Sequence, residues 1–268
     1  MKFVQDLGKL YNNINTSLPK DQQKIFMDSK TLLIGRLPNI QAYFIGSDDP
    51  ASFQENEQLL GPDWKYYGSA ESITYRYNNV GHRTDMDIFN PPDVWGLAVG
   101  CSGTEGQAIH YEELWHQNLG LPVYNAGIGG AGNDLSLHNI QRVLKLAPIK
   151  PKYIFFQLSL SHRFFDIRLY NEIKTVGIWD LQSTVQVYNE SVKESMATGY
   201  DYARTRVLMD ITQTLADLAG STLIFVDAYS EFDVNYMDVD QPAYTVRRQN
   251  KKYPPLSNAK ITHEHMGG

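Results

Sequence analysis

The sequence predicts an α/β protein in which a parallel sheet lies between layers of helices. Short apolar runs suited to buried strands recur at 94–100, 122–125, 153–158 and 222–227. Segments with the 3.6-residue spacing of helices separate these runs. Strands that alternate with helices favour parallel pairing and a three-layer α/β/α arrangement. The runs also end in polar or glycine-rich residues, and ligands bind at that edge of such sheets.

The first run, 94–100, reads as the central strand, and a serine follows it within a tight turn. Ser102 lies between Gly100 and Gly103, and apolar spacing predicts a helix over 105–119. A serine at this turn is either an N-cap or a nucleophile, because free N–H groups at the start of a helix favour developing negative charge. The turn alone leaves both interpretations open.

The later elements follow the same alternation. The strand at 122–125 ends in a segment with four glycines in six residues, 127–132, whose backbone can approach a ligand closely. The strand at 153–158 ends in Ser159-Leu160-Ser161-His162. Helices are predicted over 134–146 and 200–218, the second ending at Gly220.

The N-terminal part lacks this alternation of strands and helices. We therefore expect an extension over 1–71 that precedes the main domain, 72–268. Residues 1–35 have helical spacing, and residues 36–90 are irregular apart from a short strand at 72–77. Residues 166–198 are polar and aromatic and are expected to be an insertion with short helices.

Composition narrows the possible partners and the compartment. The 268 residues carry a formal net charge of −6, which disfavours nucleic acid as the main partner. No apolar run is long enough to span a membrane, and no secretory signal is recognisable, so we expect a cytoplasmic or virion-associated protein. The single cysteine, Cys101, excludes an intramolecular disulfide and is expected to be a buried thiol. The 17 tyrosines suggest a surface that faces a sugar or a protein.

A serine nucleophile needs a base, and the chain has seven histidines. His162, His263 and His265 fall in loops at the edge of the sheet where Ser102 is expected, and His82 lies in the polar loop before the central strand. His263 and His265 are two residues apart, but without further ligands they are a weak metal signal. We therefore expect neither a metal nor another cofactor.

Together these segments resemble the SGNH hydrolases, the GDSL-type esterases and lipases. Gly100-Cys101-Ser102-Gly103-Thr104 is similar to the first conserved block, in the variant that has Cys in place of Asp, and Asn125 to Gly130 is similar to the second. The resemblance covers about 72–268. It implies a flavodoxin-like fold, Ser102 as nucleophile, and the N–H groups of Ser102 and Gly130 as oxyanion-hole donors.

The third and fourth blocks depart from the family pattern. Ser161 stands where the family has an asparagine that donates to the oxyanion, and Thr262 stands where it has the aspartate that orients the histidine. His265 keeps the family register before Met266-Gly267, so the resemblance implies a Ser102–His265 dyad. His263 is the nearest rival, and His162 and His82 remain as further candidates for the base.

The sequence thus predicts a carboxylic ester hydrolase that acts on a small-molecule or carbohydrate ester, with an O-acetyl group on a sugar favoured by the aromatic content. The alternative is a binding or structural module of the same fold, for instance in a virion or surface assembly, whose chemistry has been lost. The replacements at Ser161 and Thr262 favour that alternative. The oligomeric state does not follow from the sequence.

Overall fold

The computed structural model describes residues 24–43, 74–107, 109–167, 172–177 and 200–227, together with the single residues 58, 190 and 193. The candidates Thr262, His263 and His265 lie outside the described residues. Among the described helices, none combines the length and the apolarity that crossing a membrane requires.

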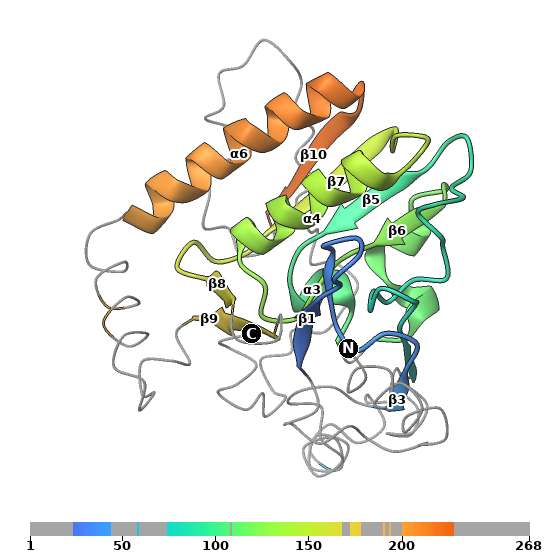
Figure 1. Ribbon diagram of the computed structural model, residues 1–268, viewed down its shortest axis with the longest axis horizontal. Helices are drawn as coiled ribbons and strands as arrows, with labels where there is room; N and C mark the ends of the chain where they lie inside the picture. The colour runs from blue at the N-terminus through green and yellow to red at the C-terminus, as the bar shows by residue number, and fades with distance from the viewer. Residues whose placement is uncertain are drawn as a thin grey trace.

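A parallel sheet forms the centre of the protein (Figure 1). Its strands are β5 (Gly96–Val99), β6 (Val123–Asn125), β7 (Tyr153–Leu158) and β10 (Thr222–Asp227), in the order β10-β7-β5-β6. Every neighbouring pair is parallel, with Leu97 opposite both Tyr124 and Ile154. The predicted parallel sheet is confirmed, as is the central place of the strand that precedes Ser102.

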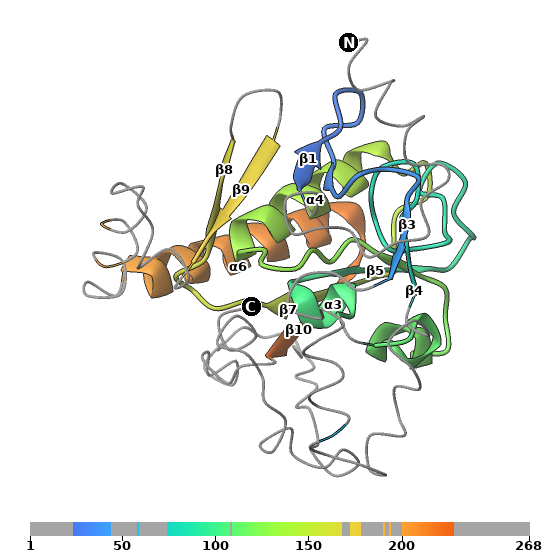
Figure 2. The same ribbon diagram turned by 90° about the horizontal axis from the view of Figure 1, so that it is seen from below.

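Two long helices cover one face of this sheet (Figure 2). They are α4 (Asn133–Leu146) and α6 (Tyr200–Ala219), close to the predicted spans. Alternate strand residues such as Leu97, Phe156 and Phe225 pack against Ile140 and Met209 of these helices in the main hydrophobic core. The intervening residues are also buried in β5 and β6, so both faces of these strands are covered. In β10, at the edge of the sheet, the intervening residue Thr222 is exposed.

The opposite face of the sheet carries shorter elements. Ala98 and Phe155 point to this side and pack with Trp115. The chain that covers it comprises α3 (Ser102–Glu105) and the 3-10 helices η4 (Tyr111–Glu113) and η5 (Trp115–Asn118). Long helices lie on one face only within the described residues, so the second helical layer stays a prediction.

The helix expected over 105–119 is wrong. The chain leaves the helical path at Gly106, whose φ of 83° is left-handed. A side chain there would collide with Leu114, because a Cβ atom on Gly106 would lie 1.9 Å from Leu114 Cδ2. The apolar residues that have helical spacing make separate contacts instead of forming one face of a helix. Leu114 is fully buried, and Trp115 packs edge-on against Phe155.

The helical prediction for 1–35 is also wrong for its described part. Residues 24–43 hold the strands β1 (Ile25–Met27), β2 (Ile34–Gly35) and β3 (Gln41–Tyr43). The turn between β1 and β2 is fixed by Asp28, whose carboxylate accepts hydrogen bonds from the N–H and the hydroxyl of Thr31 at 2.7 and 2.6 Å. Aspartate favours such turns because its side chain bonds to nearby backbone.

Two further sheets join the N-terminal strands to later parts of the chain. β1 pairs with β9 (Glu172–Val176), which forms a hairpin with β8 (Phe164–Ile167). β3 pairs with β4 (Thr74–Arg76), the strand predicted at 72–77. In the described part of 166–198, residues 166–167 and 172–176 thus lie in strands, whereas the single residues 190 and 193 are helical, as expected. The boundary at residue 71 stays a prediction, although strand pairing crosses it.

Candidate functional site

Three loops at the carboxyl ends of the parallel strands lie against one another. The turn at Ser102 follows the central strand β5, the glycine-rich loop follows β6, and Ser159–Arg163 follow β7. The glycine-rich loop approaches α3 closely, since a Cβ atom on Gly127 would lie 2.7 Å from Thr104 Cβ. A Cβ atom on Gly132 would lie 2.4 Å from Arg163 O, so the same loop contacts the third one. The absence of side chains at these glycines allows the loops to meet.

Ser102 is the first residue of the one-turn helix α3 and is partly exposed. The N-cap position belongs to Cys101, and no side chain caps the helix, so the N-cap interpretation of Ser102 does not hold. The Ser102 hydroxyl lies 3.9 Å from Cys101 Sγ, which is its one recorded polar contact within the described residues. The side chain of Ser102 is therefore not committed to supporting the local backbone.

Cys101 is fully buried and forms no disulfide, as expected. It stands between strand β5 and Ser102, on the side of the chain that packs inside the protein. The predicted buried thiol is confirmed.

Most backbone N–H groups of the glycine-rich loop are hydrogen-bonded within the protein. The amides of Ala126 and Ile128 donate to Ala98 O and Gly100 O, at 2.8 and 3.0 Å, so the loop is tied to strand β5. Gly127 N–H donates to Asn125 Oδ1 at 2.9 Å, and Ala131 N–H donates to Ile128 O. Gly130, at a left-handed φ of 79°, and Gly132 are the exceptions: their N–H groups have no acceptor among the described residues.

The third loop is held by two side chains, the buried Asn133 and the partly exposed Arg204. Asn133, at the start of α4, accepts from Ser159 N–H at 2.7 Å and donates to Ser159 O at 3.0 Å. Arg204 of α6 donates to the carbonyl oxygens of Ser161 and Arg163 at 2.9 and 2.8 Å. Ser161 and His162 are both buried, and their predicted roles, as oxyanion donor and alternative base, remain predictions.

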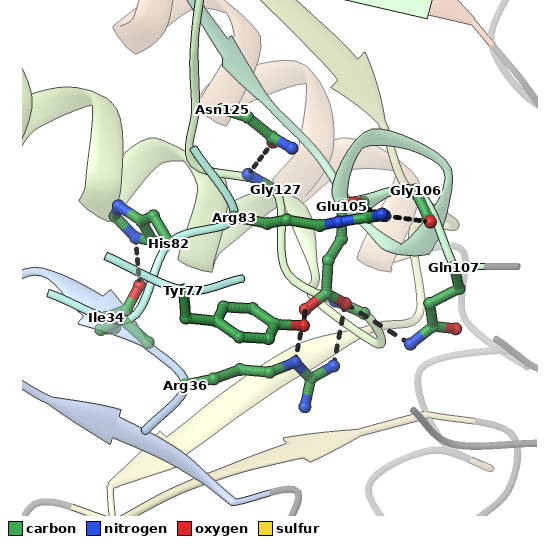
Figure 3. A network of polar contacts seen from close by, with 11 residues as sticks. Ile34, Arg36, Tyr77, His82, Arg83, Glu105, Gly106, Gln107, Asn125 and Gly127 are labelled. Atoms are coloured by element: carbon green, nitrogen blue, oxygen red, sulfur yellow. Dashed lines mark hydrogen bonds and ion pairs between the residues drawn. The ribbon is translucent and has the colours of Figure 1, made fainter. Parts of the chain in front are cut away.

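His82 does not have the surroundings of a general base. It is fully buried, and its Nε2 lies 2.8 Å from Ile34 O (Figure 3). Its Nδ1 lies 2.8 Å from Tyr124 Oη. Both ring nitrogens are thus occupied, one donating and one accepting. Burial lowers the pKa of His82 to about 4. This histidine joins β2 to the sheet and is a structural residue.

A buried carboxylate beneath the serine turn is the feature that sequence reasoning missed. Glu105, the last residue of α3, has no exposed surface, and the side chains of Arg36 and Tyr77 converge on it (Figure 3). Arg36 forms a two-pronged ion pair through Nε and Nη2, the second contact at 2.9 Å, and Tyr77 donates its hydroxyl at 3.0 Å. Gly129 N–H donates to the same carboxylate at 2.6 Å.

The charge of Glu105 is stabilised by these contacts. Burial by itself raises the pKa of the carboxyl group, but Arg36 and the hydrogen bonds from Arg36, Gly129 and Tyr77 outweigh it and hold the pKa below its usual value. Glu105 is therefore ionised at neutral pH. A single acidic residue among glycines and apolar residues was the available signal, but its arginine partner lies 69 positions earlier in the chain.

Arg83 supports the chain just after Glu105. Its guanidinium group is fully buried, lies 4.3 Å from the centre of the Tyr75 ring, and donates to the carbonyl oxygens of Glu105, Gly106 and Ile109. These bonds satisfy the backbone where α3 ends without a following helix. A pocket of about 170 Å³ opens nearby, lined by Thr74, Arg76, Asp85, His110, Tyr111 and Glu112.

The described residues contain no cluster of three or more His, Cys, Asp or Glu side chains that could hold a metal ion. A scan of the chain against protein-family models and a search of curated protein sequences both found no match. The interpretation of the site therefore depends on its own geometry and on the motifs in the sequence.

Proposed function

We propose that the chain is a serine ester hydrolase of the SGNH type, with a flavodoxin-like α/β/α fold. The observation that carries the proposal is the pairing of two features at neighbouring strand ends. Ser102 follows the central strand with its hydroxyl in contact with Cys101 Sγ alone, and the Gly130 N–H group has no acceptor, among the residues that the structure describes. A nucleophile beside an unused, rigidly held donor is what acyl transfer requires.

In the proposed reaction, Ser102 Oγ attacks the ester carbonyl carbon while a histidine takes the hydroxyl proton. The N–H groups of Ser102 and Gly130 donate to the negative oxygen of the tetrahedral intermediate, and Ser161 is a further donor. Collapse of the intermediate expels the alcohol, which receives the proton from the imidazolium. Water then attacks the acyl-enzyme in the same way and releases the acid.

His265 is the proposed base, with His263 as its rival; the family register supports the first. Without an aspartate at position 262, the dyad lacks the carboxylate that orients the imidazole, so a modest turnover is expected. The proposed substrate is an O-acetyl ester of a carbohydrate, which the tyrosine-rich composition favours.

The test uses a fluorophosphonate probe together with p-nitrophenyl acetate. We expect the probe to label Ser102, and we expect Ser102→Ala to lose both labelling and turnover while unfolding at an unchanged temperature. If the folded wild-type protein shows no labelling and no turnover, the hydrolase proposal is refuted. That result would favour the alternative, a module of the same fold without catalysis, which the replacements at Ser161 and Thr262 support.

A further inference from the structure

We propose that Glu105 is a positioning residue that holds the Gly130 N–H group in place for catalysis. The inference builds on the proposed hydrolase function and assigns a role to a buried ion pair that the reaction itself does not use. Glu105 belongs to the same helical turn as Ser102, three residues along the chain. Its carboxylate accepts a hydrogen bond from the N–H of Gly129, the residue before Gly130. One side chain thereby connects the nucleophile to the loop that carries the oxyanion donor.

The contact is short and charged, which makes it a strong restraint. Gly129 N–H donates to Glu105 Oε2 at 2.6 Å, and hydrogen bonds to an ionised acceptor are about twice as strong as neutral ones. The peptide plane that follows Gly129 carries the N–H of Gly130. Fixing Gly129 therefore restricts the direction in which Gly130 N–H points.

The carboxylate is itself prevented from moving. Its other oxygen, Oε1, accepts from Arg36 and from Tyr77 Oη, while Oε2 also accepts from Arg36 Nη2 at 2.9 Å. Arg36 and Glu105 are both almost completely buried, at 6% and 0% exposure. A buried pair of this kind is weak evidence for stability but defines geometry well. Arg36 is in turn anchored through its backbone, since its N–H donates to Gly81 O.

The fit around Gly129 shows that the loop is seated against this ion pair. A Cβ atom on Gly129 would lie 2.8 Å from Glu105 Oε2, 2.9 Å from Arg36 Nη2 and 2.3 Å from Gln107 Nε2. Only glycine allows the backbone to come this close. Gly129→Ala would therefore push the loop away from Glu105 without altering the ion pair chemically.

Two variants disturb the contact from opposite sides. Arg36→Leu combined with Glu105→Leu removes both charges, leaving no unpaired buried ion, and deprives Gly129 N–H of its acceptor. Gly129→Ala displaces the loop sterically. Ser221→Ala is the matched control, because it removes one buried hydrogen bond, from Ser221 Oγ to Pro151 O at 2.6 Å, at the opposite end of the sheet.

The experiment measures kcat and KM with p-nitrophenyl acetate and the hydrogen exchange of the amides in 126–131. Both test variants should lower kcat roughly 10- to 100-fold with KM nearly unchanged, because loss of one oxyanion donor acts on the transition state. The same variants should exchange the loop amides faster, and Ser221→Ala should change neither quantity.

The outcomes separate this proposal from the function on which it depends. If the wild-type protein turns over ester and the test variants keep its kcat, Glu105 has no positioning role and the hydrolase stands. If the wild-type protein neither turns over ester nor reacts with the fluorophosphonate, the hydrolase is wrong, and the catalytic role of Glu105 is wrong with it. Loop exchange that is equal in wild type and variants would also contradict the proposed restraint.

Discussion

Glu105 and His82 are both buried ionisable residues, but Glu105 is charged at neutral pH whereas His82 is neutral. Glu105 stays charged because Arg36, Tyr77 and Gly129 N–H surround its carboxylate, and the pKa of that group is held below its usual value. His82 stays neutral because burial lowers its pKa to about 4 and its two nitrogens are both bonded. His116, also buried, likewise has a pKa lowered to about 4.

These shifts predict that the protein loses stability between pH 7 and pH 5. In that range the unfolded histidines take up protons near pH 6.5 while folded His82 and His116 do not, so acid favours the unfolded state. Each histidine should contribute a loss of roughly 2 kcal/mol at pH 5. Glu105 should add to the loss of stability only below its unfolded pKa, because above that value it is ionised in both states and its contribution to stability is fully present.

Urea denaturation at pH 7 and pH 5 measures the effect. His82→Gln, which retains a donor for Ile34 O, should lower stability at pH 7 but roughly halve the loss between the two pH values. Identical pH dependence in wild type and variant would show that His82 is not the neutral, buried group described.

At Ser102, the proposed nucleophile, the proposed choice of base predicts a difference between two nearby histidines. His265→Ala should reduce ester turnover almost as far as Ser102→Ala, by roughly 10³-fold or more, because the serine would lack a proton acceptor. His263→Ala should have a milder effect. Steady-state kinetics of the two variants decide the matter, and loss of turnover in His263→Ala alone would reverse the assignment.

Among the secondary-structure elements, the short helix α3 shows how one glycine decides the path of the chain. Gly106 ends α3 in a left-handed conformation, and Arg83 donates to the carbonyl oxygens on either side of it. The chain then returns over the sheet as two 3-10 helices, so that Leu114 fills the space beside Gly106. This turn keeps Glu105 beneath the serine.

Gly106→Ala should therefore be much more harmful than a matched change at Gly120. Both glycines have positive φ, 83° and 72°, and an alanine costs about 1–2 kcal/mol in that conformation. A Cβ atom at Gly120 meets nothing within 4 Å, whereas one at Gly106 overlaps Leu114. We expect Gly120→Ala to lose only the conformational cost and Gly106→Ala to lose about 2 kcal/mol more, from overpacking. Equal denaturation midpoints would contradict the packing seen at Gly106.

Across the whole molecule, the N-terminal strands are joined to the central layers by side chains of α4. Asn139 accepts from Ile34 N–H at 2.9 Å and donates to Ile34 O at 2.8 Å, so its amide pairs with β2 as another strand would. Arg142 of the same helix donates to Thr31 O. The two sheets are thus connected through polar contacts as well as through the smaller core cluster around Ile34 and Leu135.

Asn139→Ala should destabilise the protein by about 2–3 kcal/mol, because it leaves both backbone groups of Ile34 with fewer partners in a buried place. His138→Ala, at the position before Asn139, removes a more exposed contact to Leu32 O and should lower the free energy of unfolding by less than about 1 kcal/mol. Thermal unfolding of the two variants compares them directly. A larger loss for His138→Ala would show that β2 is not held by Asn139.

Local periodicity was a good guide where the pattern and the packing agree. The strands at 96–99, 123–125, 153–158 and 222–227 were predictable because each is a short run rich in apolar residues, and the first two are buried throughout. The helix α4 was predictable because apolar residues such as Leu135, Ile140 and Val143 lie on its buried face. For α6 the span was predictable but the buried face was not, since its apolar residues Val207, Ile211 and Leu218 are exposed. Periodicity predicted helices at 105–119 and at 24–35 that do not form. Apolar residues with helical spacing there pack separately against partners that are distant in the chain.

The sequence by itself determined the order of the four parallel strands and of the helices α4 and α6 along the chain, and with it the positions of Ser102 and of the glycine-rich loop at the ends of two strands. It could do so because those features depend on residues close together in the chain. Only the tertiary structure decided that Arg36, Tyr77 and Gly129 gather on Glu105, and that His82 is enclosed between Ile34 and Tyr124. The contacts on Glu105 and His82 join residues up to 69 positions apart, and no local pattern shows which distant segments meet.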